Sequence, residues 1–369
     1  MTPVHIPAHI ESLAPYQPGK AISELAREKK LDRIVKLASN ENPLGPSPRA
    51  LEALATSAGD SHRYVDPSSY ELTHTLAAKL GRKPGQIICG AGTDSLLSYI
   101  LMAFSARGAE VLTAAGTFIG IFVNTRKLNR KLKTVPLADH KFDLDAMAKA
   151  ITEETKIVYI ANPNNPTGSI VTRDELDMFL KRVPEHVLVI LDEAYFNYAH
   201  DDSEYPDGLT YELPNLIVTR TFSKDFGLAG LRIGFAVADE RLIKTLYRVR
   251  LPFEPCYAAQ LAALAALADN EFLDRTLAQN ARSLEVMSAG LNDLGIRFIQ
   301  SRANFLSMIF DSEELARSFT SACLNRGLIL RHTNTFGVPE GVRMNSGTDD
   351  ETSFALNIIA DVYPGLADA

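Results

Sequence analysis

Short apolar runs and amphipathic stretches alternate along most of the chain, from about residue 69 to residue 250. Short apolar runs bounded by polar residues are typical of buried strands, and apolar residues at every third or fourth position are typical of helices. The expected strands are residues 87–89, 110–113, 133–136, 156–161, 187–192, 216–219 and 233–236. The expected helices between them include 71–80, 96–104, 144–151 and 173–182. This alternation predicts an α/β fold, with a mostly parallel seven-stranded sheet flanked by helices.

The first part of the chain, before the alternating region, reads as an extended arm. Its pattern predicts a short helix over 22–30 and a strand over 34–37, followed by a loop rich in asparagine, proline and glycine over 39–46. A helix is expected to begin after that loop, because Ser47 is a good N-cap and Pro48 suits the first helical position.

The C-terminal part of the chain predicts a smaller α+β domain. A long helical region is expected over 246–294, and residues 296–369 alternate strands with helices and end in a helix from Asp350. The expected division is 1–45 for the N-terminal arm and part of the small domain, 46–260 for the large domain and 261–369 for the small C-terminal domain.

Four clusters of polar residues follow expected strands. Ligands of α/β sheets collect beyond the carboxyl ends of the strands, so we expect these clusters to meet. The first cluster is 90–94, where small residues lead from a strand into a helix. The exposed backbone N–H groups at such a helix start suit a phosphate, although an ordinary capped turn would have a similar sequence.

The second and third clusters could hold the ring of a ligand. Residues 162–168 contain two X-Pro pairs and a glycine, which form a rigid turn able to present an asparagine amide to a phenolic oxygen. The third cluster begins at Asp192, at the end of a fully apolar strand. A carboxylate buried there is costly without a positive partner, and a protonated pyridine nitrogen would be such a partner. An N-cap for the following helix is the alternative interpretation of Asp192.

The fourth cluster contains Lys224 shortly after an apolar strand, with Thr221 and Ser223 before it and Arg232 after it. A lysine forms an imine with an aldehyde, and the side chains of threonine, serine and arginine can hold a phosphate. Both needs coincide in pyridoxal 5′-phosphate, which binds through a lysine and serves as an electron sink. A lysine after a strand is, by itself, more often a solvated surface residue. Together, however, the four clusters supply every group that this cofactor requires.

Composition narrows the class of protein. The 369 residues are 46% apolar and 22% charged, which is typical of a soluble globular protein, and the formal charge of −7 argues against a nucleic-acid partner. Cys89, Cys256 and Cys323 are too far apart for a disulfide framework or a zinc site, so no metal is expected and a reducing compartment is favoured. Because the sequence contains neither a signal peptide nor an apolar run long enough for a membrane span, we expect a cytoplasmic protein.

Four motifs resemble those of one enzyme family. They are Lys-Leu-Ala-Ser-Asn-Glu-Asn-Pro-Leu-Gly at 36–45, Asn-Asn-Pro-Thr-Gly at 164–168, Asp-Glu-Ala-Tyr at 192–195 and Ser-Lys-Asp-Phe-Gly-Leu-Ala-Gly-Leu-Arg at 223–232. From end to end the chain resembles the fold-type I, aspartate-aminotransferase-like family of pyridoxal-phosphate enzymes. Within that family it most resembles the histidinol-phosphate aminotransferases.

The resemblance implies a role for each cluster. Lys224 would form the imine and move a proton, while Asp192 would pair with the ring nitrogen. Asn165 and Tyr195 would hydrogen-bond the ring oxygen, and Phe118 would stack on the ring. The phosphate would be held by Gly92, Thr93, Asp94, Thr221, Ser223 and Arg232, and by Tyr64 of a second subunit, which implies a homodimer with shared active sites. Substrate recognition would involve Tyr16, Asn304, Arg331 and Arg343.

By the same resemblance, the expected activity is amino transfer between histidinol phosphate and 2-oxoglutarate, which yields imidazole-acetol phosphate and glutamate in histidine biosynthesis. Three departures from the usual family motifs leave the substrate open: residues 114–118 lack the usual Pro-Thr-Tyr, no Glu follows Asp94, and Tyr-Val-Asp-Pro at 64–67 replaces the more usual Tyr-Pro-Asp. One alternative is an aromatic amino-acid aminotransferase on the same fold. The other is an enzyme like threonine-phosphate decarboxylase.

Overall fold

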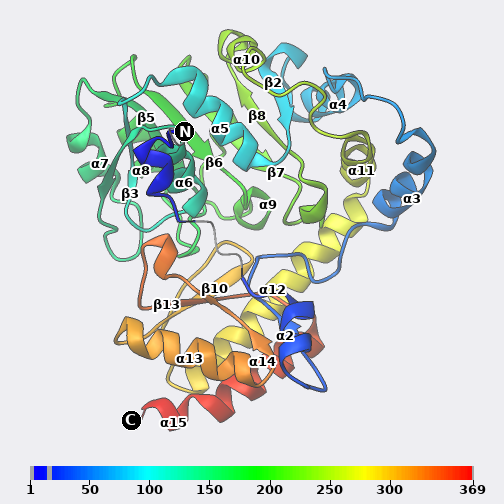
Figure 1. Ribbon diagram of the computed structural model, residues 1–369, viewed down its shortest axis with the longest axis vertical. Helices are drawn as coiled ribbons and strands as arrows, with labels where there is room; N and C mark the ends of the chain where they lie inside the picture. The colour runs from blue at the N-terminus through cyan, green and yellow to red at the C-terminus, as the bar shows by residue number, and fades with distance from the viewer. Residues whose placement is uncertain (1–3, 15–18, 368–369) are drawn as a thin grey trace.

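The computed structural model describes residues 4–14 and 19–367, which fold around two main hydrophobic cores. The larger core draws on residues between Ala50 and Leu267. The second core joins Val35 and Leu37 to residues between Met287 and Val362. In Figure 1 the larger unit lies above the smaller one, and α12 (Asn270–Asp293) runs from the first towards the second. The domain boundaries expected at residues 45 and 260 stay a prediction.

The larger unit is built on one mixed sheet with the strand order β2-β8-β7-β6-β5-β3-β4. Its strands are β2 (Ile87–Gly90), β3 (Glu110–Ala114), β4 (Lys131–Val135), β5 (Thr155–Ala161), β6 (Leu188–Asp192), β7 (Leu216–Thr221) and β8 (Gly234–Ala238). Neighbouring strands are parallel except where β8 pairs with β2 and with β7. The predicted seven-stranded, mostly parallel sheet is therefore confirmed.

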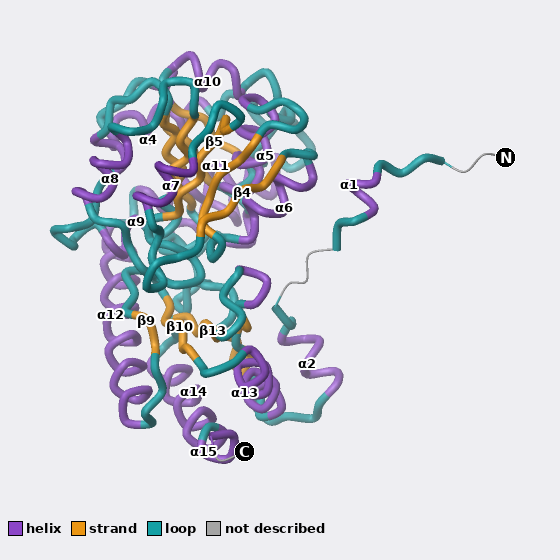
Figure 2. The backbone as a smooth tube through the Cα atoms, turned by 90° about the vertical axis from the view of Figure 1, so that its left-hand side faces the viewer, coloured by secondary structure: helices purple, strands orange, loops and turns teal. Residues whose placement is uncertain are grey.

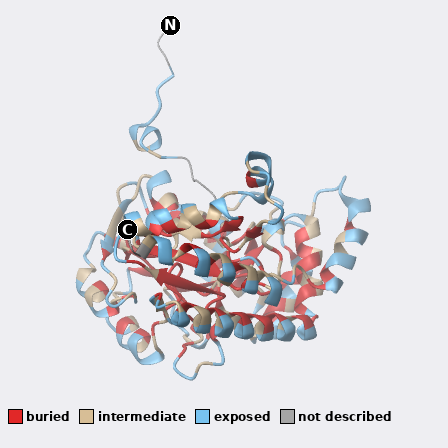
Figure 3. Ribbon diagram, turned by 90° about the horizontal axis from the view of Figure 1, so that it is seen from below, coloured by how far each residue is buried: buried red, intermediate tan, exposed pale blue. Residues whose placement is uncertain are grey.

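Burial explains why the sequences of the central strands are continuous apolar runs. Every residue of β6 and β7 is buried, and so is all of β5 except Lys156. Strands that helices cover on both faces lose the alternation of apolar and polar residues. Figure 3 shows these buried strands at the centre, with helices whose outer faces are exposed around them.

The helices of the larger unit connect and cover its strands. They are α3 (Pro48–Ser57), α4 (Tyr70–Leu80), α5 (Thr93–Phe104), α6 (Ile119–Lys127), α7 (Leu144–Ala150), α8 (Arg173–Leu180), α9 (Phe196–Ala199), α10 (Glu240–Leu246) and α11 (Tyr257–Leu267), with 3-10 turns η1 (Ala58–Asp60), η2 (Pro84–Gln86), η3 (Gly208–Thr210) and η4 (Ala229–Leu231). Ser47 caps α3 as expected, because its side chain accepts a hydrogen bond from the backbone N–H of Ala50. None of the helices in the described part of the chain is long and apolar enough to cross a membrane.

The smaller unit is an antiparallel sheet covered by helices. Its strand order is β12-β13-β10-β9, with β9 (Phe298–Ile299), β10 (Phe305–Ile309), β12 (Arg331–His332) and β13 (Gly341–Asn345). The remaining elements are α12, α13 (Glu313–Asn325), α14 (Asp349–Val362), α15 (Pro364–Ala367) and the 3-10 turn η5 (Asn334–Phe336).

The N-terminal segment is attached to the smaller unit by main-chain pairing. Strand β1 (Val35–Lys36) pairs in parallel with β11 (Leu328–Ile329). Before it come α1 (Ala8–Glu11), which has no buried residue, and α2 (Ile22–Glu28), which buries Leu25. Figure 2 shows the segment that carries α1 extending to one side of the body. After β1, residues 37–46 lead from the smaller unit to α3.

One predicted element is wrong. The helical region expected from residue 246 begins only at Tyr257, because residues 247–256 form an irregular connection. Two prolines, Pro252 and Pro255, lie in that connection, and proline lacks the N–H that a helix interior needs. The helix then stops at Leu267, and Asp269 caps the new helix α12 through the backbone N–H of Phe272.

Candidate active site

All four polar clusters contribute to one cavity of about 240 Å³. It lies at the carboxyl ends of β5, β6 and β7, where ligands of α/β sheets collect. Ten of the predicted site residues line it: Thr93, Asp94, Phe118, Asn165, Asp192, Tyr195, Thr221, Ser223, Lys224 and Arg232. The sheet topology therefore brings together side chains that are far apart in the sequence.

Lys224 enters the cavity from the loop that follows β7. Its amine Nζ donates a hydrogen bond of 3.3 Å to the carbonyl oxygen of Ser39 and lies 5.9 Å from the centroid of the Tyr195 ring. Burial lowers the pKa of Lys224 to about 8, and the positive charge of Arg343 acts in the same direction. The uncharged, nucleophilic form of this amine is therefore available near neutral pH, unlike that of a solvated lysine.

Asp192 ends β6 as a buried carboxylate, with only 4% of its surface exposed. Its Oδ2 accepts a hydrogen bond of 2.7 Å from the hydroxyl of Tyr159. Its other oxygen, Oδ1, makes no hydrogen bond of good geometry among the residues that the structure describes, although the Thr219 hydroxyl and the Ala194 backbone N–H lie near enough to the carboxylate to lower its pKa. Burial raises the pKa of Asp192, and the Tyr159 hydroxyl opposes part of that rise. A buried carboxylate with one oxygen to spare fits a ligand that brings a positive charge.

An anion cradle forms where α5 begins. Gly92, the N-cap of α5, has a φ of +83°, and a Cβ atom placed there would lie 2.6 Å from Nη2 of Arg232. Arg232 thus lies over the helix start, where its Nη1 donates to Ser223 Oγ (3.5 Å) and to the carbonyl oxygen of Ala229 (3.0 Å). The helix N-terminus, a guanidinium and the hydroxyls of Ser223 and Thr221 together make a site suited to phosphate.

Phe118 and Asn165 form two further parts of the cavity wall. Phe118 comes directly before α6, and a Cβ atom at Gly120 would lie 2.3 Å from Phe118 Cε1, so glycine at that position makes room for the ring. Asn165 follows the cis peptide bond between Asn162 and Pro163, in the turn expected from the sequence. Its Oδ1 accepts a hydrogen bond from Nη1 of Arg343.

Tyr195 forms the wall next to Asp192. Its phenolic oxygen accepts a hydrogen bond of 2.7 Å from the Asn40 side-chain amide. Burial raises the pKa of Tyr195 to about 12, while Arg343 and Asn40 oppose the rise. Tyr195 therefore keeps its proton and remains a hydrogen-bond donor at physiological pH.

Other predicted residues do not line this cavity. Tyr64 is 84% exposed, and its ring stacks on Phe253 at a centroid distance of 4.3 Å. Asn304 is buried and donates to the carbonyl oxygen of Asn40 at 3.1 Å. Gly92 does not line the cavity either, but its lack of a side chain makes room for Arg232, which does. Tyr16 lies outside the described residues.

The two predicted substrate arginines lie opposite each other on neighbouring strands. Arg331 on β12 is in register with Arg343 on β13, and each guanidinium carbon is 5.3 Å from the centroid of the Phe336 ring. Arg343 is buried and also donates to the carbonyl oxygen of Ala38 at 2.8 Å. Through its bond to Asn165, Arg343 reaches the cavity wall.

Sequence reasoning missed three residues that present polar side chains to the cavity: Ser39, Glu41 and Tyr159. Ser39 and Glu41 belong to a loop that was predicted as a turn-rich connection and matched a family motif, but no role was assigned to either side chain. Tyr159 is a fully buried aromatic within an apolar strand, so its sequence context is that of an ordinary core residue. A usable signal was its position two residues before Ala161, because alternate residues of a strand share a face and Ala161 adjoins the 162–168 turn.

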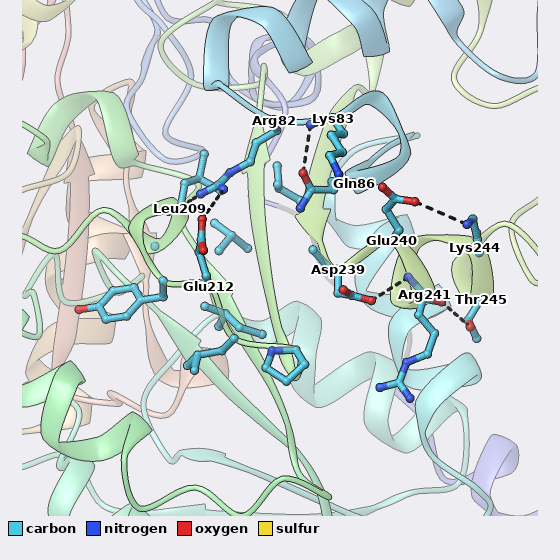
Figure 4. A pocket seen from close by; sticks show the side chains of 18 of the residues that line it. Arg82, Lys83, Gln86, Leu209, Glu212, Asp239, Glu240, Arg241, Lys244 and Thr245 are labelled. Carbon is cyan, nitrogen blue, oxygen red and sulfur yellow. Dashed lines mark hydrogen bonds and ion pairs between the residues drawn. The ribbon is translucent and has the colours of Figure 1, made fainter.

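A larger groove, of about 900 Å³, lies at the other end of the sheet (Figure 4). It contains Leu216, the first residue of β7, whereas Lys224 follows the last. Several of its charged side chains pair with groups in the groove itself, as Arg82 does with Glu212 (3.6 Å) and Lys244 with Glu240 (3.5 Å). This groove is therefore separate from the four clusters and is not the candidate active site.

Comparison with known proteins agrees with the fold and the cavity. Solved structures show the aspartate-aminotransferase-like fold: an aspartate aminotransferase from Thermus thermophilus with maleate superposes with a TM-score of 0.83 at 21% identity, covering 97% of this chain and 100% of the other. The family model "Aminotransferase class I and II" matches residues 32–359. The chain belongs to this aminotransferase family, as its motifs predicted.

More similar relatives share one name. Histidinol-phosphate aminotransferase 2 of Methylococcus capsulatus is 42% identical over 350 residues, which cover 93% of this chain and 94% of that protein. The histidinol-phosphate aminotransferase of Brevibacillus brevis is 40% identical over 354 residues, covering 95% and 96%. The crystal structure of histidinol-phosphate aminotransferase from Sinorhizobium meliloti, in complex with pyridoxal-5′-phosphate, has a TM-score of 0.91 at 30% identity and 98% coverage of both chains.

The environment of Lys224 predicts the pH dependence of its reactivity. A lowered pKa means that the amine loses its proton at lower pH, so the rate of imine formation with an aldehyde should rise through pH about 8 and then level off. Borohydride trapping followed by mass spectrometry of the Lys224 peptide measures this rate in the ligand-free protein. Solvated lysines in the same sample are the reference, since they titrate near pH ~10.4. A Lys224 rate that still rose with theirs would contradict the prediction.

The Tyr159 hydroxyl should stabilise the fold through Asp192. Tyr159→Phe removes the donor and leaves the buried Oδ2 oxygen without its partner, which should lower the free energy of unfolding by about 1–3 kcal/mol. Urea denaturation measures the change. Tyr70→Phe is the control, because Tyr70 is exposed and its substitution should change stability by less than about 0.5 kcal/mol. Equal stability of the two variants would show that the hydrogen bond contributes nothing.

Proposed function

We propose that the protein is a pyridoxal-phosphate-dependent aminotransferase that interconverts histidinol phosphate and 2-oxoglutarate with imidazole-acetol phosphate and glutamate, in histidine biosynthesis. The observation that carries the proposal is the convergence of Lys224, Asp192 and the start of α5 on one cavity. The choice of histidinol phosphate as the substrate rests on relatives that are about 40% identical over nearly the whole chain and are named histidinol-phosphate aminotransferases.

The cavity residues fit pyridoxal 5′-phosphate group by group. Its aldehyde would meet the Lys224 amine, and its protonated ring nitrogen would meet Oδ1 of Asp192, an oxygen without a partner among the described residues. Its phenolic oxygen would take hydrogen bonds from Asn165 and Tyr195. Its phosphate would lie in the anion cradle formed by the start of α5, Thr221, Ser223 and Arg232. When bound, the cofactor supplies an aldehyde that captures amines and a ring that accepts electrons.

The chain's own side chains would carry the proton transfers. We propose that Lys224 moves the proton on the substrate carbon that bears the amino group, because the Lys224 amine faces the cavity and has a pKa of about 8. Asp192 would hold the ring nitrogen protonated through its buried negative charge. Tyr195, protonated at physiological pH, would donate to the ring oxygen. The Phe118 ring would cover the cofactor and exclude water.

The arginine pair fits an anionic substrate group. Guanidinium groups bind phosphate and carboxylate oxygens in pairs, and Arg331 and Arg343 lie in register on neighbouring strands. Histidinol phosphate offers a phosphate and glutamate offers carboxylates, so one pair of arginines would serve both half-reactions. Asn304 is proposed to support this region through the neighbouring loop, and Tyr16 to take part in substrate recognition. Arg343 also touches Asn165, which links the substrate region to the cofactor region.

We propose a homodimer as the active unit. Tyr64 is highly exposed, and exposed apolar side chains near it in sequence or space include Tyr70, Leu251 and Phe253. A group of large exposed apolar residues is typical of an interaction surface. Tyr64 does not line the cavity of its own chain, so we propose that it binds the cofactor phosphate in the cavity of the partner subunit.

A cytoplasmic location is proposed on the basis of the cysteines. Cys89, Cys256 and Cys323 are all free thiols, and Cys89 and Cys323 are buried. Unpaired cysteines are usual where glutathione and thioredoxin keep thiols reduced.

A spectral half-reaction tests the substrate and the mechanism together. Histidinol phosphate added to the cofactor-loaded enzyme without an acceptor should abolish the absorbance of the lysine-bound cofactor and produce that of its amine form. Phenylalanine should act at least ~10-fold more slowly if the arginine pair selects phosphate. Faster bleaching by phenylalanine would support an aromatic aminotransferase, and release of carbon dioxide without the amine form would support a decarboxylase. Lys224→Ala is the control and should lose at least ~1,000-fold in turnover.

Mixing two inactive variants tests the shared active site. Lys224→Ala and Tyr64→Ala should each be impaired alone. In a mixed dimer, one of the two sites would contain both defects and the other neither. After unfolding and refolding together in equal amounts, they should recover about a quarter of the wild-type activity, because half the dimers are mixed and each has one intact site. Activity equal to the mean of the separate variants would show that Tyr64 serves its own chain only.

A further inference from the structure

Asn40 connects three separate parts of the molecule. It lies between β1 and α3, is only 1% exposed and has a φ of +55°, a left-handed conformation that asparagine tolerates better than most residues. Its backbone N–H donates to Asn345 Oδ1 at 3.0 Å, and its carbonyl oxygen accepts from the amide of Asn304 at 3.1 Å. Its own amide donates to the Tyr195 oxygen at 2.7 Å. One residue thus joins the end of β13, the start of β10 and the cavity wall that follows β6.

Its neighbours contact other parts of the proposed machinery. The carbonyl oxygen of Ala38 accepts from Arg343, and that of Ser39 accepts from Lys224. Ser39 and Glu41 line the cavity, while Asn40 reaches it only through Tyr195. The backbone around Asn40 is therefore fixed from several sides, and its side chain is held by one hydrogen bond, from Nδ2 to Tyr195, while Oδ1 has no partner among the described residues.

The direction of the hydrogen bond to Tyr195 matters. An amide N–H only donates, so the Tyr195 oxygen is the acceptor in this bond and the phenolic hydrogen stays available for another acceptor. Tyr195 lines the cavity, so that acceptor can be a ligand there. Donation to the phenolic oxygen also makes the hydroxyl a stronger donor, because hydrogen bonds in a chain polarise one another.

We propose that Asn40 is a positioning residue that holds Tyr195 as a hydrogen-bond donor toward the cofactor's phenolic oxygen. The inference rests on the proposed function, because it takes pyridoxal phosphate as the ligand that Tyr195 meets. Asn40 touches neither cofactor nor substrate in this role. It acts through Tyr195 and ties that side chain to the segment that contacts Arg343 and Lys224.

The test measures the absorbance of the cofactor-loaded enzyme as a function of pH. The midpoint of the change is the pH at which half of the lysine–cofactor imine has lost its proton. Donation to the phenolic oxygen stabilises its anionic form and favours loss of the nearby imine proton, so a weaker donor should raise this midpoint. Asn40→Gly keeps both backbone hydrogen bonds, tolerates the left-handed backbone and removes the amide. We expect a rise of about one pH unit. Tyr195→Phe should also raise the midpoint, and adding Asn40→Gly to it should cause little further shift, because both changes act through one bond.

Asn129→Gly is the matched control, since Asn129 also has a φ of +55° but does not line the cavity. Its midpoint should equal that of the wild type. Asn40→Asp is a second variant that suits the same backbone and replaces the donor with an acceptor, so it too should raise the midpoint. An unchanged midpoint in both Asn40 variants, or additive shifts in the double variant, would overturn the inference while the enzyme still transaminates. Failure of the wild type to transaminate would instead refute the proposed function.

Discussion

The buried carboxylate of Asp192 is the constraint around which the site is arranged. It ends a strand at the centre of the sheet, in surroundings that raise its pKa, and the described residues satisfy only one of its two oxygens. That oxygen is bound by Tyr159, which comes from the adjacent strand β5. A charge so placed is tolerated when a positive group meets the second oxygen. The lysine loop, the anion cradle and the aromatic wall lie around the cavity into which such a group would fit.

The reversed strand β8 explains how the anion cradle forms. Because β8 runs antiparallel to β7 and to β2, its first residue, Gly234, pairs with both Thr221 and Gly90. The chain therefore leaves β7 through the Lys224 loop and returns with Arg232 at the same edge of the sheet. Gly90, at the end of β2, leads directly into Gly92 and the start of α5. A fully parallel connection would have carried Arg232 to the opposite edge before the next strand began.

The sequence predicted those parts of the fold and the site that are local in the chain. Apolar runs located all seven central strands, and polar clusters after those runs marked the strand ends where Asp192 and Lys224 emerge. Asn40 and Tyr159 were missed because their partners are remote: Asn40 bonds to residues 155 and 305 positions away. Residues 247–256 were predicted as part of the helical region over 246–294, although Pro252 and Pro255 lie among them. Tyr64 does not line the cavity of its own chain, so the role proposed for it depends on a second subunit.

The larger unit cannot form the cavity alone. Ser39 and Glu41 line it, yet they belong to the segment between β1 and α3, and β1 pairs with β11 of the smaller unit. Arg343, on the smaller sheet, donates to Asn165 on the cavity wall and to Ala38 beside Ser39. Any rotation of the smaller unit would therefore move the contacts of Lys224 and Tyr195 at the same time. Because the hydrogen bonds at Ala38, Ser39 and Asn40 follow one another along three residues, the position of the Arg343 guanidinium and that of the Lys224 amine are mechanically joined.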